Sequence, residues 1–358
     1  MYYRKLGRTG LMVSEISFGT IPILQGSVPV LPAYFNLSEE QALEVMEHAF
    51  RLGCNLYDTA IFPEYGDAEQ KLGKFAAKIG RERIIISDKA RFFDGNAMYA
   101  AVLSSCEYLK TLPDIYFVHQ ADAEHEEEIF QKGGALDALC ELKKEGKIRF
   151  TGLASHYYDI LLRGAMDSRV DVLQASGNIL ERGMLDRIRE ELHFYSKGIF
   201  INKVYAAGIL PRFFPVKTLI TSVLSYPVSS VLIGIGTKEQ AEAAMLWDTS
   251  LPSSPPSFSQ VISHLEKEFS PIPCDRCQRC KCPCGTEIHT LFRQYNYYFL
   301  GKDYWALRKL NLGISRSAEL CQFCTDMPCL SMCPKQIRIP DEIERVLELV
   351  KTCYPIRG

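Results

Sequence analysis

Short apolar runs alternate with longer amphipathic stretches from residue 16 to residue 235, and the alternation repeats eight times. The apolar runs have the length of strands, while the stretches between them carry helical periodicity. Eight strand–helix units in one stretch predict an α/β fold, a (β/α)₈ TIM barrel, because that fold closes with eight parallel strands that are each followed by a helix. The expected strands cover residues 16–20, 55–60, 83–90, 114–120, 147–155, 170–176, 198–204 and 229–235.

A doubly wound open sheet is the alternative that this alternation permits. It would normally have about six strands and a glycine-rich phosphate loop after the first one. The chain offers only Gly19 at that place, so we favour the barrel. The segments 38–53 and 124–146 are expected to be two of its helices. The first opens with Ser38 as a cap, and the second ends on Gly146.

The distribution of the thirteen cysteines divides the chain in two. Nine of them lie between Cys274 and Cys333, after a Pro/Ser-rich segment at 251–259 and an expected short helix at 260–269. We therefore expect a barrel domain over 1–250, a linker and helix over 251–273, and a second domain over 274–358. Cys54, Cys106, Cys140 and Cys353 are scattered and are interpreted as incidental thiols.

Charge and hydropathy exclude several classes of function. The formal net charge is −2 and the isoelectric point is about 6.4, which gives no electrostatic signature for nucleic acid. No apolar run is long enough for a membrane span, and the N-terminus lacks the apolar stretch of a secretory signal. These features predict a cytoplasmic protein, where clustered thiols more often bind metal than form disulfides.

The cysteines form two blocks, CDRCQRCKCPCG and CQFCTDMPCLSMCP. Both contain C-x₂-C spacing and a Cys-Pro, which fits the ferredoxin pattern in which the Cys-Pro thiol binds the cluster of the other block. Two [4Fe–4S] clusters are therefore expected, with a pair of zinc sites as the alternative. The first cluster would use Cys274, Cys277, Cys280 and Cys333. The second would use Cys321, Cys324, Cys329 and one of Cys282 or Cys284, a choice that the spacing leaves open.

Residues 287–310, between the blocks, and residues 339–351, after the second block, have helical patterns. This arrangement resembles the α-helical ferredoxin module of multi-subunit oxidoreductases. The resemblance implies a small helical ferredoxin-like iron–sulfur domain at the C-terminal end, whose clusters pass single electrons.

Polar side chains stand where the expected barrel strands end. Asp58 ends the second strand, Lys89 the third and His119 the fourth, and Tyr65 follows the second strand in a loop. Barrel enzymes carry their chemistry on this rim, so these side chains are expected to meet there. A carboxylate, an ammonium, an imidazole and a phenol in one place predict an acid–base site in which Tyr65 gives a proton to a carbonyl oxygen.

Several segments resemble aldo/keto reductases in chain order. They are MYYRKLGRTGLMVSEISFGT, LYDTAIFPEYGDAEQKLGKF, IIISDKA, DIYFVHQAD and GKIRFTGLASH, and the cysteine blocks look like the tail of a subfamily with iron–sulfur motifs. The resemblance implies the catalytic set Asp58, Tyr65, Lys89 and His119. It also implies Ser155, His156 and Gln174 as contacts for the nicotinamide amide of NAD(P)H. Tyr65 stands seven residues after Asp58, where the family usually has five.

Departures from the family concern the adenosine end of the cofactor. Segment 234–244 offers only Lys238 as a cation and has Ala244 where the family usually has an asparagine. The choice between NADP, NAD and no nicotinamide therefore stays open. The leading hypothesis is reduction of a carbonyl, or oxidation of an alcohol, with a ferredoxin or another electron carrier as a possible partner. A ferredoxin-coupled reductase without nicotinamide and a non-catalytic electron-transfer subunit are the alternatives.

Overall fold

The computed structural model describes residues 1–25, 36–61, 65–246, 255–311 and 317–354. Its contacts divide the chain into two compact units. The first comprises residues 1–177, 188–205 and 214–255, and the second comprises 178–187, 206–213 and 256–358. Two short segments that lie within the expected barrel region, 178–187 and 206–213, thus belong to the second unit.

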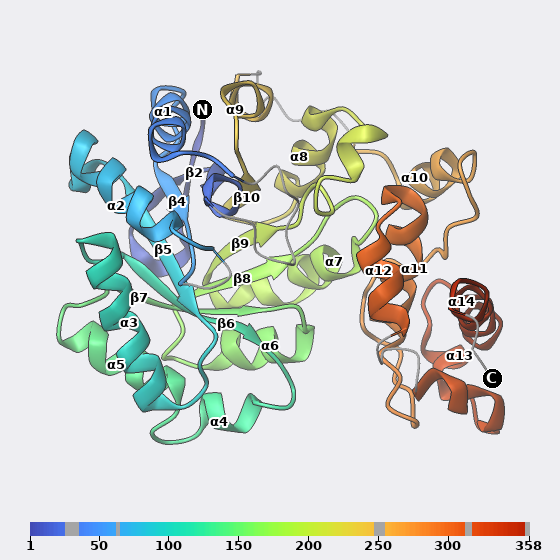
Figure 1. Ribbon diagram of the computed structural model, residues 1–358. Coiled ribbons are helices and arrows are strands. Elements are labelled where there is room, and N and C mark those ends of the chain that lie inside the picture. The colour runs from blue at the N-terminus through green and yellow to red at the C-terminus, as the bar shows by residue number, and fades with distance from the viewer. Residues whose placement is uncertain (26–35, 62–64, 247–254, 312–316, 355–358) are drawn as a thin grey trace. The chain divides into compact units, whose positions relative to one another are not determined.

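The first unit contains the predicted closed barrel of parallel strands, in the order β10-β3-β4-β5-β6-β7-β8-β9 (Figure 1). Each strand falls on its expected segment, with ends that differ by at most three residues. The strands are β3 (Ile16–Gly19), β4 (Leu56–Asp58), β5 (Ile85–Ala90), β6 (Ile115–Ala121), β7 (Phe150–Ser155), β8 (Val172–Ser176), β9 (Gly198–Asn202) and β10 (Ser230–Gly234). A short antiparallel hairpin, β1 (Tyr3–Lys5) and β2 (Met12–Ser14), precedes them.

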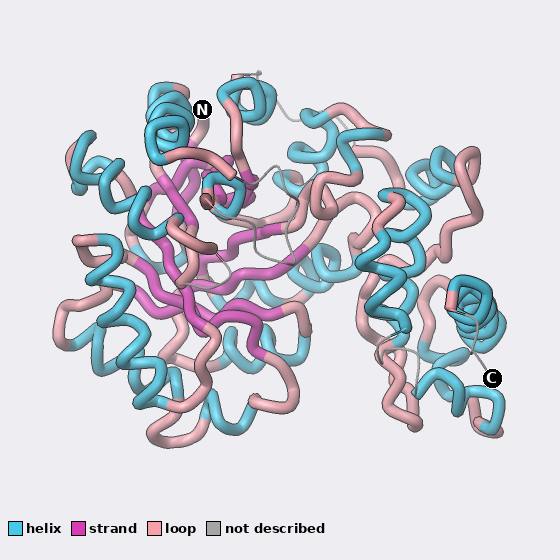
Figure 2. The backbone as a smooth tube through the Cα atoms, in the orientation of Figure 1, coloured by secondary structure: helices cyan, strands magenta, loops and turns pink. Residues whose placement is uncertain are grey.

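Helices surround these strands, as Figure 2 shows. They are α1 (Glu39–Arg51), α2 (Ala68–Ile79), α3 (Gly95–Leu109), α4 (Glu126–Phe130), α5 (Ala135–Lys144), α6 (Tyr158–Met166), α8 (Val216–Leu224) and α9 (Lys238–Met245). Helix α7 (Gly183–Glu190) begins in the second unit and ends in the first. The Ser38 hydroxyl accepts a hydrogen bond from Gln41 N–H, and the Gln41 side-chain oxygen accepts one from Ser38 N–H. This capping box fixes the start of α1 close to its predicted position.

The expected single helix over 124–146 is wrong, because the chain breaks it into α4 and α5. Gly133 adopts a left-handed backbone with φ +78°, which a helix interior does not allow. At Gly134 a Cβ atom would lie 2.1 Å from the Glu128 carbonyl oxygen, so the chain turns back on itself more tightly than a larger residue permits. The two glycines therefore end one helix and start the next.

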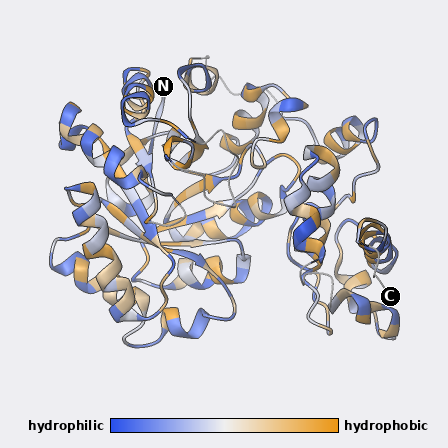
Figure 3. Ribbon diagram, viewed as in Figure 1, coloured by the Kyte–Doolittle hydropathy of each residue, from blue (hydrophilic) through white to orange (hydrophobic). Residues whose placement is uncertain are grey.

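Buried apolar side chains of the strands form one core inside the barrel. They include Leu56, Ile85, Phe117, Val172 and Phe200, which are all buried. Figure 3 shows the same division, with apolar residues along the strands and hydrophilic residues along the outer faces of helices. Side chains alternate along a strand, so the residue two positions after each of these faces the barrel interior as well. This alternation brings the polar strand ends to one rim.

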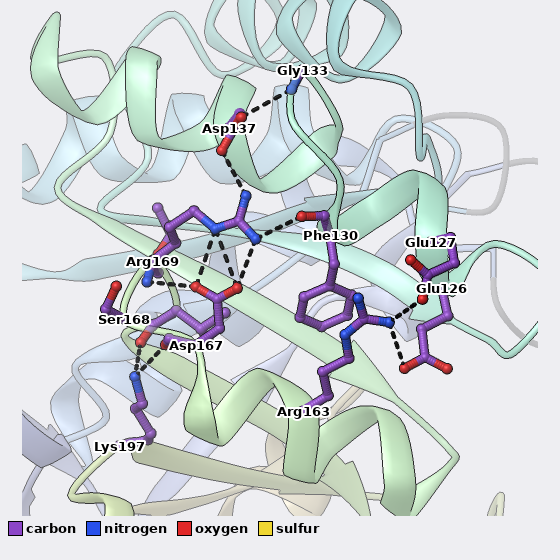
Figure 4. Close-up of polar contacts among 12 residues, drawn as sticks. Glu126, Glu127, Phe130, Gly133, Asp137, Arg163, Asp167, Ser168, Arg169 and Lys197 are labelled. Atoms are coloured by element: carbon purple, nitrogen blue, oxygen red, sulfur yellow. Dashed lines mark hydrogen bonds and ion pairs between the residues drawn. The ribbon is translucent and has the colours of Figure 1, made fainter.

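Two arginines of the first unit form hydrogen bonds and ion pairs between its loops and helices (Figure 4). Arg169 donates to Asp167, to Asp137 and to the carbonyl oxygen of Phe130. Arg163, on α6, pairs with Glu126 at 2.9 Å and with Glu127 at 2.6 Å. These contacts join α6 to α4, and they join the loop before β8 to α5 and to the end of α4.

The second unit contains α10 (Phe258–Leu265), α11 (Ile288–Gly301), α12 (Tyr304–Lys309), a 3₁₀ segment (Ser317–Phe323), α13 (Pro328–Met332) and α14 (Ile339–Cys353). Its core includes Leu291, Phe292, Ile339 and Val346, together with the buried Cys329 and Cys333. The predicted helices at 260–269, 287–310 and 339–351 correspond to α10, to the pair α11 and α12, and to α14. Residues 251–254 of the expected linker lie outside the described residues, as do 26–35 and 62–64. No described helix combines the length and the apolar character that crossing a membrane requires.

Candidate functional site

Three of the predicted side chains lie at the carboxyl ends of adjacent strands. Asp58 ends β4, Lys89 stands near the end of β5, and His119 stands near the end of β6. Leu56 and Ile85 face the barrel interior, so Asp58 and Lys89, at even spacings from them, face it too. The sequence rule that strand ends converge therefore placed these residues correctly.

Asp58 and Lys89 form a buried ion pair. The Lys89 Nζ atom lies 2.6 Å from Asp58 Oδ2, and Ser87 Oγ donates to Asp58 Oδ1 at 2.6 Å. Lys89 also donates to the carbonyl oxygen of Thr59. Burial would lower the pKa of Lys89, but Asp58, with smaller contributions from Tyr65 and Asp88, outweighs it and holds that pKa above its ordinary value. The lysine is therefore a fixed positive charge at neutral pH.

Tyr65 lies beside this ammonium. Lys89 Nζ is 5.2 Å from the centroid of the Tyr65 ring. Tyr65 precedes α2 in the loop whose residues Phe62, Pro63 and Glu64 lie outside the description. A cation close to a phenol stabilises the phenolate that remains after a proton has been given away. The geometry thus unites Asp58, Lys89 and Tyr65 as a possible proton-donating group.

His119 stands at an irregularity of β6. The register between β6 and β7 shifts between Val118 and Ala121, and Gln120 has a left-handed backbone with φ +54°. Such bulges change the direction of a side chain and are frequent beside active sites. Burial, followed by the positive charge of Lys89, lowers the pKa of His119 well below its ordinary value. The imidazole is therefore neutral at physiological pH and can serve in hydrogen bonding.

The four expected cofactor contacts differ in their surroundings. Gln174 is buried, and its Oε1 atom has no hydrogen-bond partner. The Ser155 hydroxyl already donates to the carbonyl oxygen of Ala121 at 2.6 Å. Lys238, the first residue of α9, pairs with Glu44 at 2.7 Å. Gln174 therefore offers a buried acceptor, while the charge of Lys238 already has a carboxylate partner.

His156 belongs to a hydrogen-bonded chain that the sequence did not reveal. Its Nδ1 atom lies 2.8 Å from Ser176 Oγ, and that hydroxyl donates to Asn202 Oδ1 at 2.5 Å. Because Ser176 uses its hydrogen toward Asn202, it accepts from Nδ1–H of His156, which leaves Nε2 as the acceptor of the neutral ring. Ser176 and Asn202 end β8 and β9, so the rule applied to Asp58 could have found them.

In the second unit, the cysteines fall into two neighbourhoods. One cavity is lined by Cys274, Cys277, Cys280 and Cys333, together with apolar residues that include Ile288 and Phe292. Burial raises the pKa of the Cys277 thiol to about 11 and that of Cys280 to about 12, and nearby Cys333 contributes to both shifts. The four thiols expected to bind the first cluster therefore lie around one space.

The remaining cysteines of the two blocks influence one another as a second group. Burial raises the pKa of Cys321 and of Cys329, and the charge of Cys282 adds to both shifts. Burial would also raise the pKa of Cys282, but hydrogen bonds from Thr286 and Cys284 outweigh it, so that pKa lies below its ordinary value. Cys282 and Cys284 of the first block thus lie near cysteines of the second block.

A buried ionic network anchors the first cysteine loop. Glu181 accepts from Arg276 at 2.8 Å, and the Nε atom of Arg293 lies 3.2 Å from its other carboxylate oxygen. Close by, Gly183 donates from its N–H to the carbonyl oxygen of Asp275 at 2.7 Å. A Cβ atom on Gly183 would lie 2.3 Å from the nitrogen of Cys277. Segment 178–187 therefore packs directly against the loop that carries Cys274 and Cys277.

Within the described part of the chain, no group of three or more His, Cys, Asp or Glu side chains converges in a way that could hold a single metal ion. A cluster of four irons needs its thiolates further apart than a single ion does, because each of the four thiolates binds a separate iron.

Comparisons with known proteins concern the first unit. The family model described as "Aldo/keto reductase family" matches residues 15–197, so the cysteine-rich segment lies beyond the match. The chain is similar to an "Aldo-keto reductase" of Gibberella moniliformis, with 30% identity over 184 residues, which are 46% of this chain and 53% of that protein. It is also similar to "L-galactose dehydrogenase" of Arabidopsis thaliana, with 33% identity over 168 residues, 44% of this chain and 49% of that protein.

A solved aldo-keto reductase from Bacillus halodurans, in its holo form, has a similar fold. The TM-score is 0.60 at 21% identity, and the match covers 75% of this chain and 96% of that one. The chain spans about half the length of the curated relatives that it matches.

Proposed function

The chain belongs to the aldo/keto reductase family, and on that premise we propose that it is an oxidoreductase that reduces a small carbonyl compound or oxidises the corresponding alcohol. The observation that carries this proposal is the position of the Lys89 ammonium, 2.6 Å from Asp58 and 5.2 Å from the ring centroid of Tyr65. An ammonium held by a buried carboxylate beside a phenol is suited to proton transfer to a carbonyl oxygen.

In this mechanism Tyr65 gives its proton to the carbonyl oxygen as the carbonyl carbon is reduced. Lys89 stabilises the phenolate that remains, and Asp58 holds Lys89 in place. His119, which is neutral, donates a hydrogen bond that orients the carbonyl group. Because the pKa of Lys89 is raised and that of His119 is lowered, each keeps one protonation state over the neutral range.

NAD(P)H would supply the hydride when it is bound. The buried Oε1 of Gln174 fits this cofactor, because it is an acceptor without a partner and a nicotinamide carboxamide carries an N–H donor. Ser155 and His156 are the other proposed contacts for that amide. Lys238 is the proposed contact for the adenosine end, and its ion pair with Glu44 favours NADH over NADPH because a 2′-phosphate would have to compete with that carboxylate.

We further propose that residues 274–358 form a ferredoxin-like domain with two [4Fe–4S] clusters, which pass single electrons. The cavity lined by Cys274, Cys277, Cys280 and Cys333 supports the first cluster, because soft thiolates around one space suit iron–sulfur ligation. The second would be bound by Cys321, Cys324, Cys329 and one thiol of the Cys282–Cys284 pair. Zinc bound by the same thiolates is the alternative.

Hydride transfer to a carbonyl needs no cluster, so the clusters imply exchange of electrons with a ferredoxin or another carrier in the cytoplasm. A reductase that takes electrons from ferredoxin without a nicotinamide is therefore the second candidate function. The gathering of nine cysteines between Cys274 and Cys333 is the observation that favours it. A non-catalytic electron-transfer subunit is the third.

The test uses protein reconstituted with iron and sulfide under anaerobic conditions. Iron and sulfide analysis with the visible spectrum separates clusters from zinc. Reduction of a panel of small aldehydes is then measured with NADH, NADPH and reduced ferredoxin in turn. We expect turnover with a nicotinamide. Turnover with reduced ferredoxin alone would favour the second candidate, and no turnover with any donor would favour the third.

A further inference from the structure

Three polar side chains lie next to one another at the ends of adjacent barrel strands. Ala154 and Phe200 belong to the core inside the barrel. His156 and Asn202 stand two residues after them, so they continue the same interior face. Ser176 is the register partner of Asn202, and the side chains of paired residues point to the same face of a sheet. The ends of β7, β8 and β9 therefore bring His156, Ser176 and Asn202 together.

The hydrogen bonds among these three side chains run in one direction. Ser176 Oγ donates to Asn202 Oδ1 at 2.5 Å. A hydroxyl has only one hydrogen, so its 2.8 Å contact with His156 Nδ1 uses a lone pair of the hydroxyl oxygen. The imidazole therefore carries its proton on Nδ1, and Nε2 of the neutral ring is an acceptor. Ser176 is buried, so water does not compete for either bond.

The neighbouring polar side chains of this rim offer acceptors as well. Gln174 stands two residues before Ser176 on β8 and faces the same side, and its buried Oε1 atom has no hydrogen-bond partner among the described residues. Ser155 spends its only hydrogen on the carbonyl oxygen of Ala121 at 2.6 Å. Gln174 Oε1 and His156 Nε2 therefore suit a ligand group that carries two hydrogens on one nitrogen, such as an amide NH₂ group.

We propose that Ser176 and Asn202 are positioning residues that hold His156 in the Nδ1–H tautomer, so that its Nε2 atom accepts from the carboxamide NH₂ group of a nicotinamide. Gln174 Oε1 accepts the second hydrogen of that group. A carboxylate in place of the carboxamide has no hydrogen for either acceptor, so the same arrangement discriminates against the acid form of the cofactor. This inference rests on the proposed function, in which NAD(P)H binds at this rim.

The first test reads the tautomer without a bound cofactor. Nitrogen NMR of the reconstituted full-length protein, labelled with ¹⁵N in histidine, separates protonated from unprotonated ring nitrogens, and His156→Gln identifies the signals of His156. At about pH 8.5, well above the ordinary pKa of histidine, we expect the proton on Nδ1 in the wild type. We expect the same in Asn202→Asp, whose carboxylate still accepts from Ser176, and a substantial Nε2–H population in Ser176→Ala. A wild-type ring protonated on Nε2, or an unchanged tautomer in Ser176→Ala, would overturn the proposal.

The second test measures dissociation constants by fluorescence titration with NADH and with its acid analogue, which carries a carboxylate in place of the carboxamide. The matched control is Ser222→Ala, because Ser222 is a buried serine of α8 whose hydroxyl donates to the carbonyl oxygen of Thr218 at 2.6 Å. We expect the wild type and the control to prefer NADH. Ser176→Ala should bind NADH roughly 3–10-fold more weakly and lose most of this preference.

The outcomes separate this inference from the function on which it rests. A preference for NADH that is unchanged in Ser176→Ala would overturn the inference alone, and so would a wild type that binds the acid analogue as tightly as NADH. If the wild type binds neither dinucleotide, the proposed use of a nicotinamide fails, and the carboxamide contact of His156 fails with it.

Discussion

The ammonium of Lys89 and the carboxylate of Asp58 lie 2.6 Å apart at the ends of two adjacent barrel strands, with side chains only 2% and 6% exposed. Two opposite charges that are buried in this way attract each other strongly. Removal of one leaves the other buried without a counter-charge. This pair positions the cation beside Tyr65, so it links the stability of the barrel to its proposed chemistry.

Asp58→Asn should therefore weaken both properties. The amide keeps the shape of the side chain but leaves the Lys89 ammonium without its counter-charge. We expect a loss of roughly 3–5 kcal/mol in the free energy of unfolding, measured by urea denaturation. Glu44→Gln, which breaks the exposed pair with Lys238, is the control and should change stability little. Equal effects of the two substitutions would contradict the account of the buried pair.

The lowered pKa of His119 predicts sensitivity to acid. The unfolded chain takes up a proton on this residue below about pH 6.5, whereas the folded chain resists it until a much lower pH. Stability should therefore fall as the pH drops below about 6.5. His119→Gln should reduce the difference in unfolding free energy between pH 7.5 and pH 5.5. A difference as large as that of the wild type would show that His119 does not carry the effect.

Glu181 should be essential to the second unit. Its carboxylate is buried between Arg276 and Arg293, at 2.8 Å and 3.2 Å. Burial would raise its pKa, but the two guanidinium groups outweigh it and lower that pKa. The stability that Glu181 contributes is therefore fully present above about pH 4.3, the pKa of a glutamate in the unfolded chain. It is lost as the pH falls through the lower pKa of Glu181 in the folded chain. Glu181→Gln should cost roughly 3–5 kcal/mol at pH 7, and the cost should shrink in acid. A cost that does not depend on pH would contradict this.

Gly183→Ala should disturb the first cysteine loop. The added Cβ atom would lie 2.3 Å from the Cys277 nitrogen and 2.6 Å from its Cβ atom, so the backbone of that loop must move. We expect a loss of roughly 1–3 kcal/mol and faster alkylation of Cys277 in the reconstituted protein. Gly236→Ala, whose added atom would come no closer than 3.2 Å to Pro22, is the control. Unchanged alkylation in Gly183→Ala would show that the loop tolerates the methyl group.

The barrel could be predicted because its signal is periodic and local. Each strand is a short apolar run, and parallel strands end on one rim, so the sequence predicts Asp58, Lys89 and His119 at the same rim. The break between α4 and α5 was missed, because helical periodicity continues across Gly133 and Gly134 while their backbone forbids it.

The network around Glu181 could not be predicted in the same way. Its partner Arg276 lies 95 residues further along the chain. Glu181 alone resembles any acidic residue near a helix start, and nothing local shows that the segment after β8 packs in the second unit. The two cysteine blocks and their spacing are visible in the sequence, whereas the assignment of particular thiols to two clusters stays a prediction.

In the proposed mechanism Tyr65 gives the proton in carbonyl reduction, and Tyr65→Phe removes the hydroxyl that would give it. The variant is compared with wild type in anaerobic, reconstituted form, with the electron donor that supports turnover and with iron content as the control for intact clusters. We expect kcat/KM to fall by roughly 10²–10⁴-fold, with unchanged iron content and unchanged free energy of unfolding. Carbonyl reduction at the wild-type rate in Tyr65→Phe would contradict it.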